Sequence, residues 1–132
     1  MADLADALYA RSQAVAGLTA LIGTRFTPGK LDQNSTMPAC AYQLAGVRVM
    51  HTGGEGSALR QARVHIWSFG TTYDSAKDTD AQVYAAFHDW QGTSGGVTVR
   101  HSHLEDGRDG ERDDATLRHM VLSVLHIWYD QP

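Results

Sequence analysis

Apolar residues recur every three to four positions in two stretches of the chain, a spacing that predicts amphipathic helices. The first stretch covers residues 3 to about 16 and is followed by a further apolar turn, GLTALIG, that closes at Gly23. The second stretch covers residues 72–92 and stops at Gly92. Their apolar positions are Leu4, Leu8, Val15 and Leu18 in the first, and Ala76, Val83, Phe87 and Trp90 in the second. We therefore expect two helices, each with one face on a sheet.

Four other stretches have the length and apolar content of β-strands: residues 37–45, 62–70, 95–105 and 116–129. Residues 62–70 alternate between two faces, and we expect them to pair in antiparallel fashion with 37–45. The last stretch is apolar at both parities, which predicts a strand inside the sheet that is buried on both faces. Residues 46–61 contain four glycines between two strand-like runs, so we expect a long loop there that is mobile or functional.

The expected order is α-β-β-α-β-β, which is an α/β chain of the α+β type. A mainly antiparallel four-stranded sheet with two helices packed on it buries the apolar faces of all these elements. A chain of 132 residues is long enough for one hydrophobic core, so residues 1–132 are expected to form a single domain.

Composition narrows the functional classes. A net charge of −4 and a pI near 5.9 provide no basic surface for sequence-specific nucleic-acid binding. Cys40 is the single cysteine and lies in the apolar run MPACAYQL, so a buried hydrophobe is expected there rather than a nucleophile. The start MADLADALYARSQ lacks the features of a signal peptide, and no apolar run approaches the roughly 20 residues of a membrane helix. We expect no membrane association, and a product that stays in the cytoplasm where it is made.

Histidines gather around the charged tip between the last two strands. Alternate residues of a strand share a face, so His101, His103 and Glu105 are expected to point to the same side. If the hairpin turns near Gly110, His119 falls opposite His101 and joins this patch. Against a metal site, the tip lacks the ligand spacing of a calcium loop, and neither a cysteine nor an HExxH helix accompanies the histidines. Solvated or interface histidines are the stronger interpretation, so the three histidines are weak metal candidates and no cofactor is expected.

Catalytic chemistry has less support. The GGEG run lacks the flanking strand and helix of a phosphate loop, and no GxSxG elbow occurs, so we expect no catalytic residue. His51, in the glycine-rich loop, could act as a general base only with a partner that the sequence does not identify. The remaining histidines and the tryptophans have apolar neighbours, which favours packing roles for His65, His88 and His126 and core positions for Trp67, Trp90 and Trp128.

Three stretches, taken in order, resemble the tail-completion or tail-terminator proteins of long-tailed bacteriophages and related gene transfer agents. They are residues 1–46, 62–99 and 117–129, so the resemblance covers nearly the whole chain. Its marks are LTALIGTRFTP after the leading helix, the MPACAYQL strand, the RVHIWSFGTTYDSA join and the closing LSVLHIWY. Their order and spacing are more specific than any one of them.

The resemblance implies a structural protein of the virion, without catalytic residues, that assembles as a ring of six subunits on the head-proximal end of the tail tube. There it would end tube polymerisation and present a joining surface to a head-completion or connector protein. DNA would pass through the lumen without specific binding, which suits an acidic chain. Interface roles are expected from loop placement for Arg48, His51, Glu55 and Arg60, and at the charged tip for Arg108 and Asp109.

Two alternatives stay open at this point. One is a head-completion stopper or adaptor, although stoppers of this type are sheet-rich barrels, which two helical stretches argue against. The other is a small metal-dependent α+β enzyme, which would require a convergent pocket.

Overall fold

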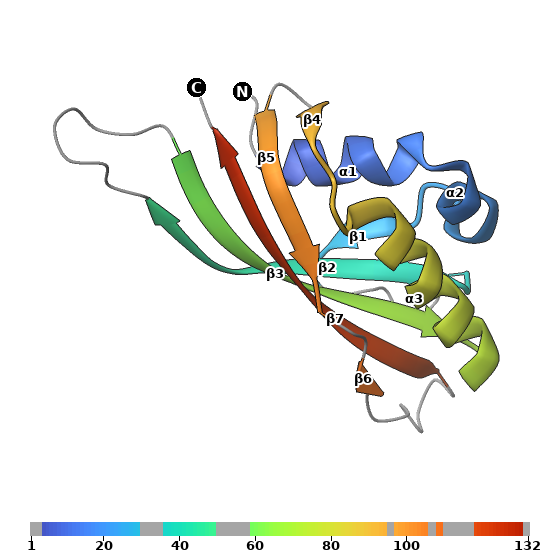
Figure 1. Cartoon of the computed structure of the whole chain (residues 1–132). Coiled ribbons are helices and arrows are strands. Elements are labelled where there is room, and N and C mark those ends of the chain that lie inside the picture. The colour runs from blue at the N-terminus through green and yellow to red at the C-terminus, as the bar shows by residue number, and fades with distance from the viewer. Residues whose placement is uncertain are drawn as a thin grey trace, which may run out of the picture.

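The computed structural model describes residues 4–29, 36–49, 59–94, 97–105, 108–109 and 118–130 (Figure 1). Its helices are α1 (Leu4–Ala14), α2 (Ala16–Ile22) and α3 (Tyr73–Phe87). Its strands are β1 (Phe26–Pro28), β2 (Ala39–Val49), β3 (Leu59–Gly70), β4 (Gly92–Ser94), β5 (Val97–Leu104), β6 (Arg108–Asp109) and β7 (His119–Asp130). Figure 1 shows these helices gathered on one side of a single curled sheet.

The sheet has the order β1-β2-β3-β7-β5-β4, and β6 pairs with β7 beside this path. All neighbours are antiparallel except β1 and β2, which are parallel. The expected pairing of 37–45 with 62–70 is confirmed, and so is the interior place of the last strand, between β3 and β5. The expected total of four strands is wrong, because β1, β4 and β6 add three short ones. Strands of two or three residues are too short for an alternation to show.

The described chain forms three helices, not the expected two, because it leaves helical geometry at Val15. This residue has an extended backbone, with φ −101° and ψ 108°, and its carbonyl accepts the N–H of Leu18 at 3.1 Å to start α2. Gly23 ends α2 at a positive φ of 58°, a conformation that favours glycine. The apolar spacing continues across Val15, so periodicity alone does not reveal the break. None of the described helices has the length and apolar content needed to span a membrane.

Helix α3 begins at a Thr72 cap, whose side chain accepts the N–H of Ser75 at 3.0 Å. It ends at Phe87, five residues before the expected stop at Gly92. The reason is that residues 88–90 bond to the edge of β5 instead. The Asp89 N–H donates to the Ser102 carbonyl at 3.0 Å, and Nδ1 of His88 accepts the Leu104 N–H at 3.2 Å.

The core lies between the three helices and one face of the sheet. At its centre the ring of Phe26 stacks on Tyr42, with centroids 4.7 Å apart, and on Phe87, at 5.7 Å. Other large and fully buried side chains are Leu8, Leu18, Ile22, Ile66, Val83, Leu125, Ile127 and Tyr129. Burial of this apolar surface is the main stabilising term of the fold.

The other face of the sheet, which we call the outer face, carries no helix in the described part of the chain (Figure 1). Along β7, the odd-numbered residues from Val121 to Tyr129 are buried, whereas Leu122, Val124 and Trp128 are only half-buried. The expectation that this strand is buried on both faces is therefore wrong. Residues of both parities are apolar because the outer face of the sheet is itself apolar, although no helix of the described chain covers it.

β2 and β3 run past the helices at the left of Figure 1. Their pairing continues to Val49 and Arg60, with a bulge between Leu44 and Gly46. The expected loop at 46–61 is therefore wrong for residues 46–49 and 59–61, which are strand; residues 50–58 lie outside the described chain. We call residues 43–48 and 59–63 the hairpin corner.

Candidate functional site

The predicted histidine patch forms only in part. His101 and His103 share the exposed side of β5, as expected, but they lie opposite Trp128 and His126 on β7. His126 is also the residue that meets Glu105, with Nε2 3.0 Å from Oε1. The expected placement of His119 opposite His101 is wrong. His119 pairs with Gly70 at the other end of β7, nine positions or roughly 30 Å from Trp128.

The described residues contain neither a group of metal ligands nor a reactive thiol. No three His, Cys, Asp or Glu side chains of that part of the chain lie close enough to hold a metal ion. Cys40 is fully buried, and its Sγ lies 3.8 Å from the Ser68 hydroxyl. Burial raises the pKa of the Cys40 thiol from 9.0 to about 12, with the Asp80 charge adding to the rise and the Ser68 hydrogen bond opposing it. A thiol that keeps its proton at neutral pH is a poor nucleophile.

The other histidines pack against aromatic rings. His88 stacks on Tyr84 with centroids 4.5 Å apart, and His65 meets Trp67 edge-on at 5.7 Å. Of the three tryptophans, only Trp90 is in the core, with 4% of its surface exposed. Core positions for Trp67 and Trp128 were wrong predictions, because both residues are half-buried on the outer face.

The residues expected at interfaces fall in two groups. Arg48 is exposed on β2, while Arg60 is half-buried on β3 and its Nε has no hydrogen-bond partner in the described structure. Arg108 and Asp109 form β6, opposite Leu122 and Val121, and their side chains lie outside the described set. His51 and Glu55 also lie outside the described residues.

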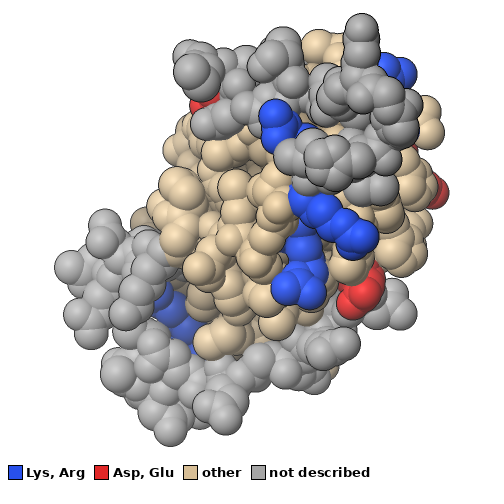
Figure 2. All heavy atoms as spheres, turned by 90° about the vertical axis from the view of Figure 1, so that its left-hand side faces the viewer, with Lys and Arg blue, Asp and Glu red and all other residues tan. Residues whose placement is uncertain are grey.

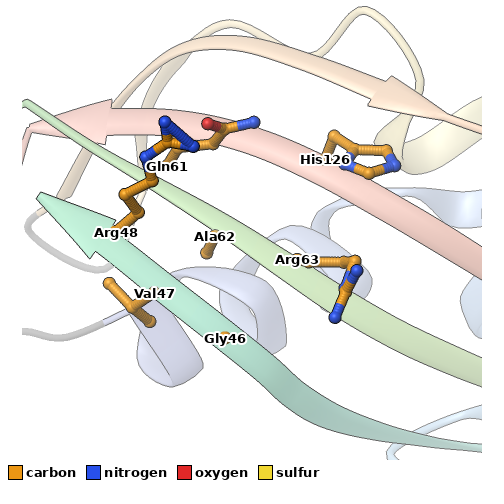
Figure 3. Close-up of a pocket in the computed structure, with 7 residues that line it drawn as sticks. All are labelled: Gly46, Val47, Arg48, Gln61, Ala62, Arg63 and His126. Atoms are coloured by element: carbon orange, nitrogen blue, oxygen red, sulfur yellow. The ribbon is translucent and has the colours of Figure 1, made fainter. Parts of the chain in front are cut away.

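The hairpin corner contains an open depression of about 300 Å³ around Gly46 (Figure 3). Its lining consists of Gly46, Val47, Arg48, Gln61, Ala62, Arg63 and His126. Gly46 lies opposite Arg63 on β3, and Arg63 lies opposite His126 on β7, so three strands contribute to the hollow. A Cβ placed on Gly46 would meet no described atom within 4 Å. The missing side chain of this glycine is therefore part of what leaves the surface open.

This corner is basic on a chain whose net charge is negative. The described residues of β2 and β3 include Arg48, Arg60 and Arg63 and no carboxylate, while the whole chain has a net charge of −4. Figure 2 shows Lys and Arg side chains gathered across this side of the molecule. Guanidinium groups bind carboxylates through charge-assisted and often bidentate hydrogen bonds. The arrangement is suited to binding an acidic surface.

Apolar side chains are exposed at the same corner. Leu44 is 41% exposed and Val47 is 51% exposed, although both belong to the sheet face that carries the helices elsewhere. They are exposed because β2 has passed the end of the helical layer (Figure 1). Exposed apolar residues beside basic ones are typical of a protein-binding surface.

Arg48 is the single residue lining this depression that was predicted from the sequence as an interface residue. The other six were not: Gly46, Val47, Gln61, Ala62, Arg63 and His126. The interpretation of 46–61 as a loop placed Gly46 and Gln61 outside the sheet. A usable signal did exist, because basic and apolar residues around a glycine, with no carboxylate on either strand, mark an unusual β-hairpin.

Comparison with known proteins identifies the family and the fold of the chain. A family model described as tail completion protein gp17 matches residues 6–130. A solved chain from the virion of a native gene transfer agent particle has a TM-score of 0.71 and 16% identity, covering 97% of this chain and 95% of that chain. A second solved chain has a TM-score of 0.56 and 18% identity, covering 97% of this chain and 96% of that one. No curated protein matches the chain.

The two solved chains share the fold, and the family model spans every described helix and strand apart from the first two residues of α1. The resemblance seen in the sequence is thereby confirmed. The chain belongs to the tail completion protein gp17 family, and its role is that of a structural protein of the bacteriophage tail.

Proposed function

We propose that this chain forms a ring of six subunits at the head-proximal end of the tail tube, where the tail joins the head. The ring ends tube polymerisation on one side and presents the joining surface for a head-completion or connector protein on the other. The observation that carries this proposal is the family match over residues 6–130. It places the chain among proteins that complete a tail, and a tube is completed by covering its growing end.

The shape of the subunit supports a role in assembly. The outer face presents the half-buried side chains of Trp67, Leu122, Val124 and Trp128 without a helical cover in the described chain. A second apolar area lies at the hairpin corner, where Leu44 and Val47 are exposed. Surfaces of this kind are buried in assemblies rather than left in water. One described sheet joins all the strands, which supports the proposal that residues 1–132 act as one domain.

The charge of the chain is consistent with a ring through which DNA passes. A net charge of −4 gives no general attraction to phosphates, so the lumen would let DNA move without holding it. The basic residues of the hairpin corner are a local exception, and we assign them to a protein contact rather than to the lumen.

The test is to delete the gene from its phage or particle-producing strain and measure the tails by electron microscopy. The proposal expects tails of variable, extended length and heads that remain unjoined, with both defects corrected by the wild-type gene supplied in trans. A gold label on the chain should mark the head-proximal end of each tail. Tails of normal length joined to heads in the deletion strain would reject the proposal.

A further inference from the structure

We infer that the hairpin corner of one subunit docks on the exposed face of α3 in a second copy of this chain. This contact deepens the proposed ring and rests on it. Three features of the described residues support this contact: a basic corner, an acidic and small-residue helix face, and their positions at opposite ends of the subunit.

The corner is shaped for side-chain docking rather than for strand addition. β1 pairs only with Cys40, Ala41 and Tyr42, so from Gln43 onward the edge of β2 has no strand beside it in the described chain. The bulge between Leu44 and Gly46 interrupts the regular spacing of backbone groups on that edge. Bulges of this kind protect an edge from pairing with another strand. A helix that presents side chains fits this edge better.

The exposed face of α3 complements the corner in charge. Its exposed residues are Tyr73, Asp74, Asp78, Ala81, Tyr84 and Ala85. Asp74, Asp78, Ala81 and Ala85 follow one another at steps of four, three and four residues, which places them in one stripe along the helix. Two carboxylates therefore lie at the N-terminal end of the stripe and two small residues at the other end. Neither Asp74 nor Asp78 forms an ion pair in the described structure.

The remaining groups on this helix leave the complementarity intact. Lys77 lies beside the stripe with its Nζ 5.5 Å from the centre of the Tyr73 ring, and Tyr84 stacks on His88. With three aspartates and one lysine, α3 is net negative. The two exposed aspartates match Arg48 and Arg63 of the corner, which both point to the outer face of the sheet. Leu44 and Val47 point to the opposite face of the hairpin and take no part in this match.

Geometry makes the contact intermolecular. Figure 1 shows the hairpin corner and α3 at opposite ends of the subunit, so the corner cannot reach its own α3. A contact between two different surfaces of identical chains is head-to-tail, and it closes into a ring when the rotation between neighbours divides a full turn. The partner is therefore a second copy, and each subunit both gives and receives one contact.

Charge reversal tests the contact. Variant one carries Arg48→Glu and Arg63→Glu, and variant two carries Asp74→Arg and Asp78→Arg. The control carries Arg100→Glu and Asp130→Arg, which reverses an ion pair that lies within one subunit. Asp130 lies opposite Leu59 at the edge of the corner, so this control also shows whether a charge change near the corner is enough to weaken assembly. Circular dichroism and urea unfolding establish that each variant is folded, and sedimentation velocity measures its assembly.

The wild type and the control should form a closed oligomer, and each variant alone should associate at least about tenfold more weakly, because like charges then meet at every contact. An equimolar mixture of the two variants should assemble again, since alternating subunits restore opposite charges. Either folded variant assembling like the wild type, a mixture that stays dissociated, or a wild type that remains monomeric at millimolar concentration would each overturn the inference. A normal ring that is absent from tail ends would instead reject the proposed function and leave this contact standing.

Discussion

The Oγ of Ser102 lies 2.7 Å from the backbone nitrogen of Trp90 and accepts its N–H at a point where both residues are buried. The same hydroxyl donates to the Phe87 carbonyl at 2.5 Å. One side chain on β5 thus bonds both the last residue of α3 and the turn that follows it. These bonds fix how the helix leaves the sheet.

Ser102→Ala should therefore lower the free energy of unfolding by about 1–3 kcal/mol, because it leaves a buried donor and a buried acceptor without a partner. Urea unfolding measures the change. Thr93→Ala is the matched control, since it removes an exposed hydroxyl pair with Thr98 and should cost less than about 0.5 kcal/mol. Equal effects of the two substitutions would show that the buried hydrogen bonds of Ser102 stabilise the fold no more than the exposed pair of Thr93 and Thr98.

The buried Cys40 thiol should make the folded chain less stable at high pH. In the folded chain the pKa of its thiol is raised to about 12, whereas the ordinary value is 9.0. The contribution of the buried, protonated thiol is therefore complete below pH 9 and is lost as the pH rises from about 9 to about 12. The slope in this window approaches about 1.4 kcal/mol per pH unit. Urea unfolding of wild type and Cys40→Ala at pH 8 to 11 checks this, and parallel pH profiles of the two proteins would contradict it.

Gly70 lies where β3 turns into α3 and has no room for a side chain. A Cβ there would be 2.6 Å from the backbone nitrogen of Ala76 and 2.8 Å from Cβ of Ser75. Gly70→Ala should lower the free energy of unfolding by about 1–3 kcal/mol, because backbone must move to relieve the overlap. Gly46→Ala is the control, because the Cβ that it adds would meet no described atom within 4 Å. This substitution should change the free energy of unfolding by less than about 0.5 kcal/mol. A Gly70→Ala protein as stable as the control would show that the connection between β3 and α3 can move to make room for the added Cβ.

Trp90 and Trp128 should respond differently to truncation. Trp90 is buried against Phe87, with ring centroids 5.8 Å apart, so Trp90→Ala should cost about 3–5 kcal/mol in urea unfolding. Trp128 is half-buried on the outer face beside His101, and Trp128→Ala should cost less than about 2 kcal/mol. The reverse order of the two costs would mean that Trp128, and not Trp90, lies in the core.

The long strands and their neighbours could be predicted because their patterns are local. Alternation identified β3, and the apolar content of both parities gave β7 its place inside the sheet. The same pattern wrongly predicted that β7 is buried on both of its faces. An apolar residue on a sheet face such as Val124 is half-exposed unless another element covers it, and the presence of that cover is a property of the tertiary structure.

Register was the main feature that could not be predicted. The pairing of His103 with His126 follows from matching the buried residues of the two strands and from a bulge between Val99 and His101. Neither the bulge nor the length of the intervening hairpin can be read from a hydrophobic pattern. A shift in register moves every cross-strand pair, so the expected patch of His101 with His119 could not form. For the candidate site, Arg48 and Arg60 were identified from the sequence, whereas Arg63 and His126 required the three-strand register.

The last prediction concerns residues 51–58, HTGGEGSA, which lie outside the described residues. β2 and β3 remain paired up to Val49 and Arg60, so the hydrogen bonds of the hairpin corner do not depend on the segment beyond them. Replacing 51–58 with a short Gly/Ser turn should change the free energy of unfolding by less than about 0.5 kcal/mol. The same replacement should abolish assembly on tail tubes, because a segment with three glycines is costly to order and is expected to be held by neighbouring subunits.

Two measurements separate the outcomes of this replacement. Urea unfolding reports on the subunit, and electron microscopy of complemented tails reports on assembly, with a Gly/Ser segment of the original length as the control for shortening. If the shortened chain still ends tails and joins heads, the segment is a passive connection, because the hairpin corner and α3 then suffice for the contact. If the chain instead unfolds, residues 51–58 contribute to the folded core and the pairing of β2 with β3 depends on them.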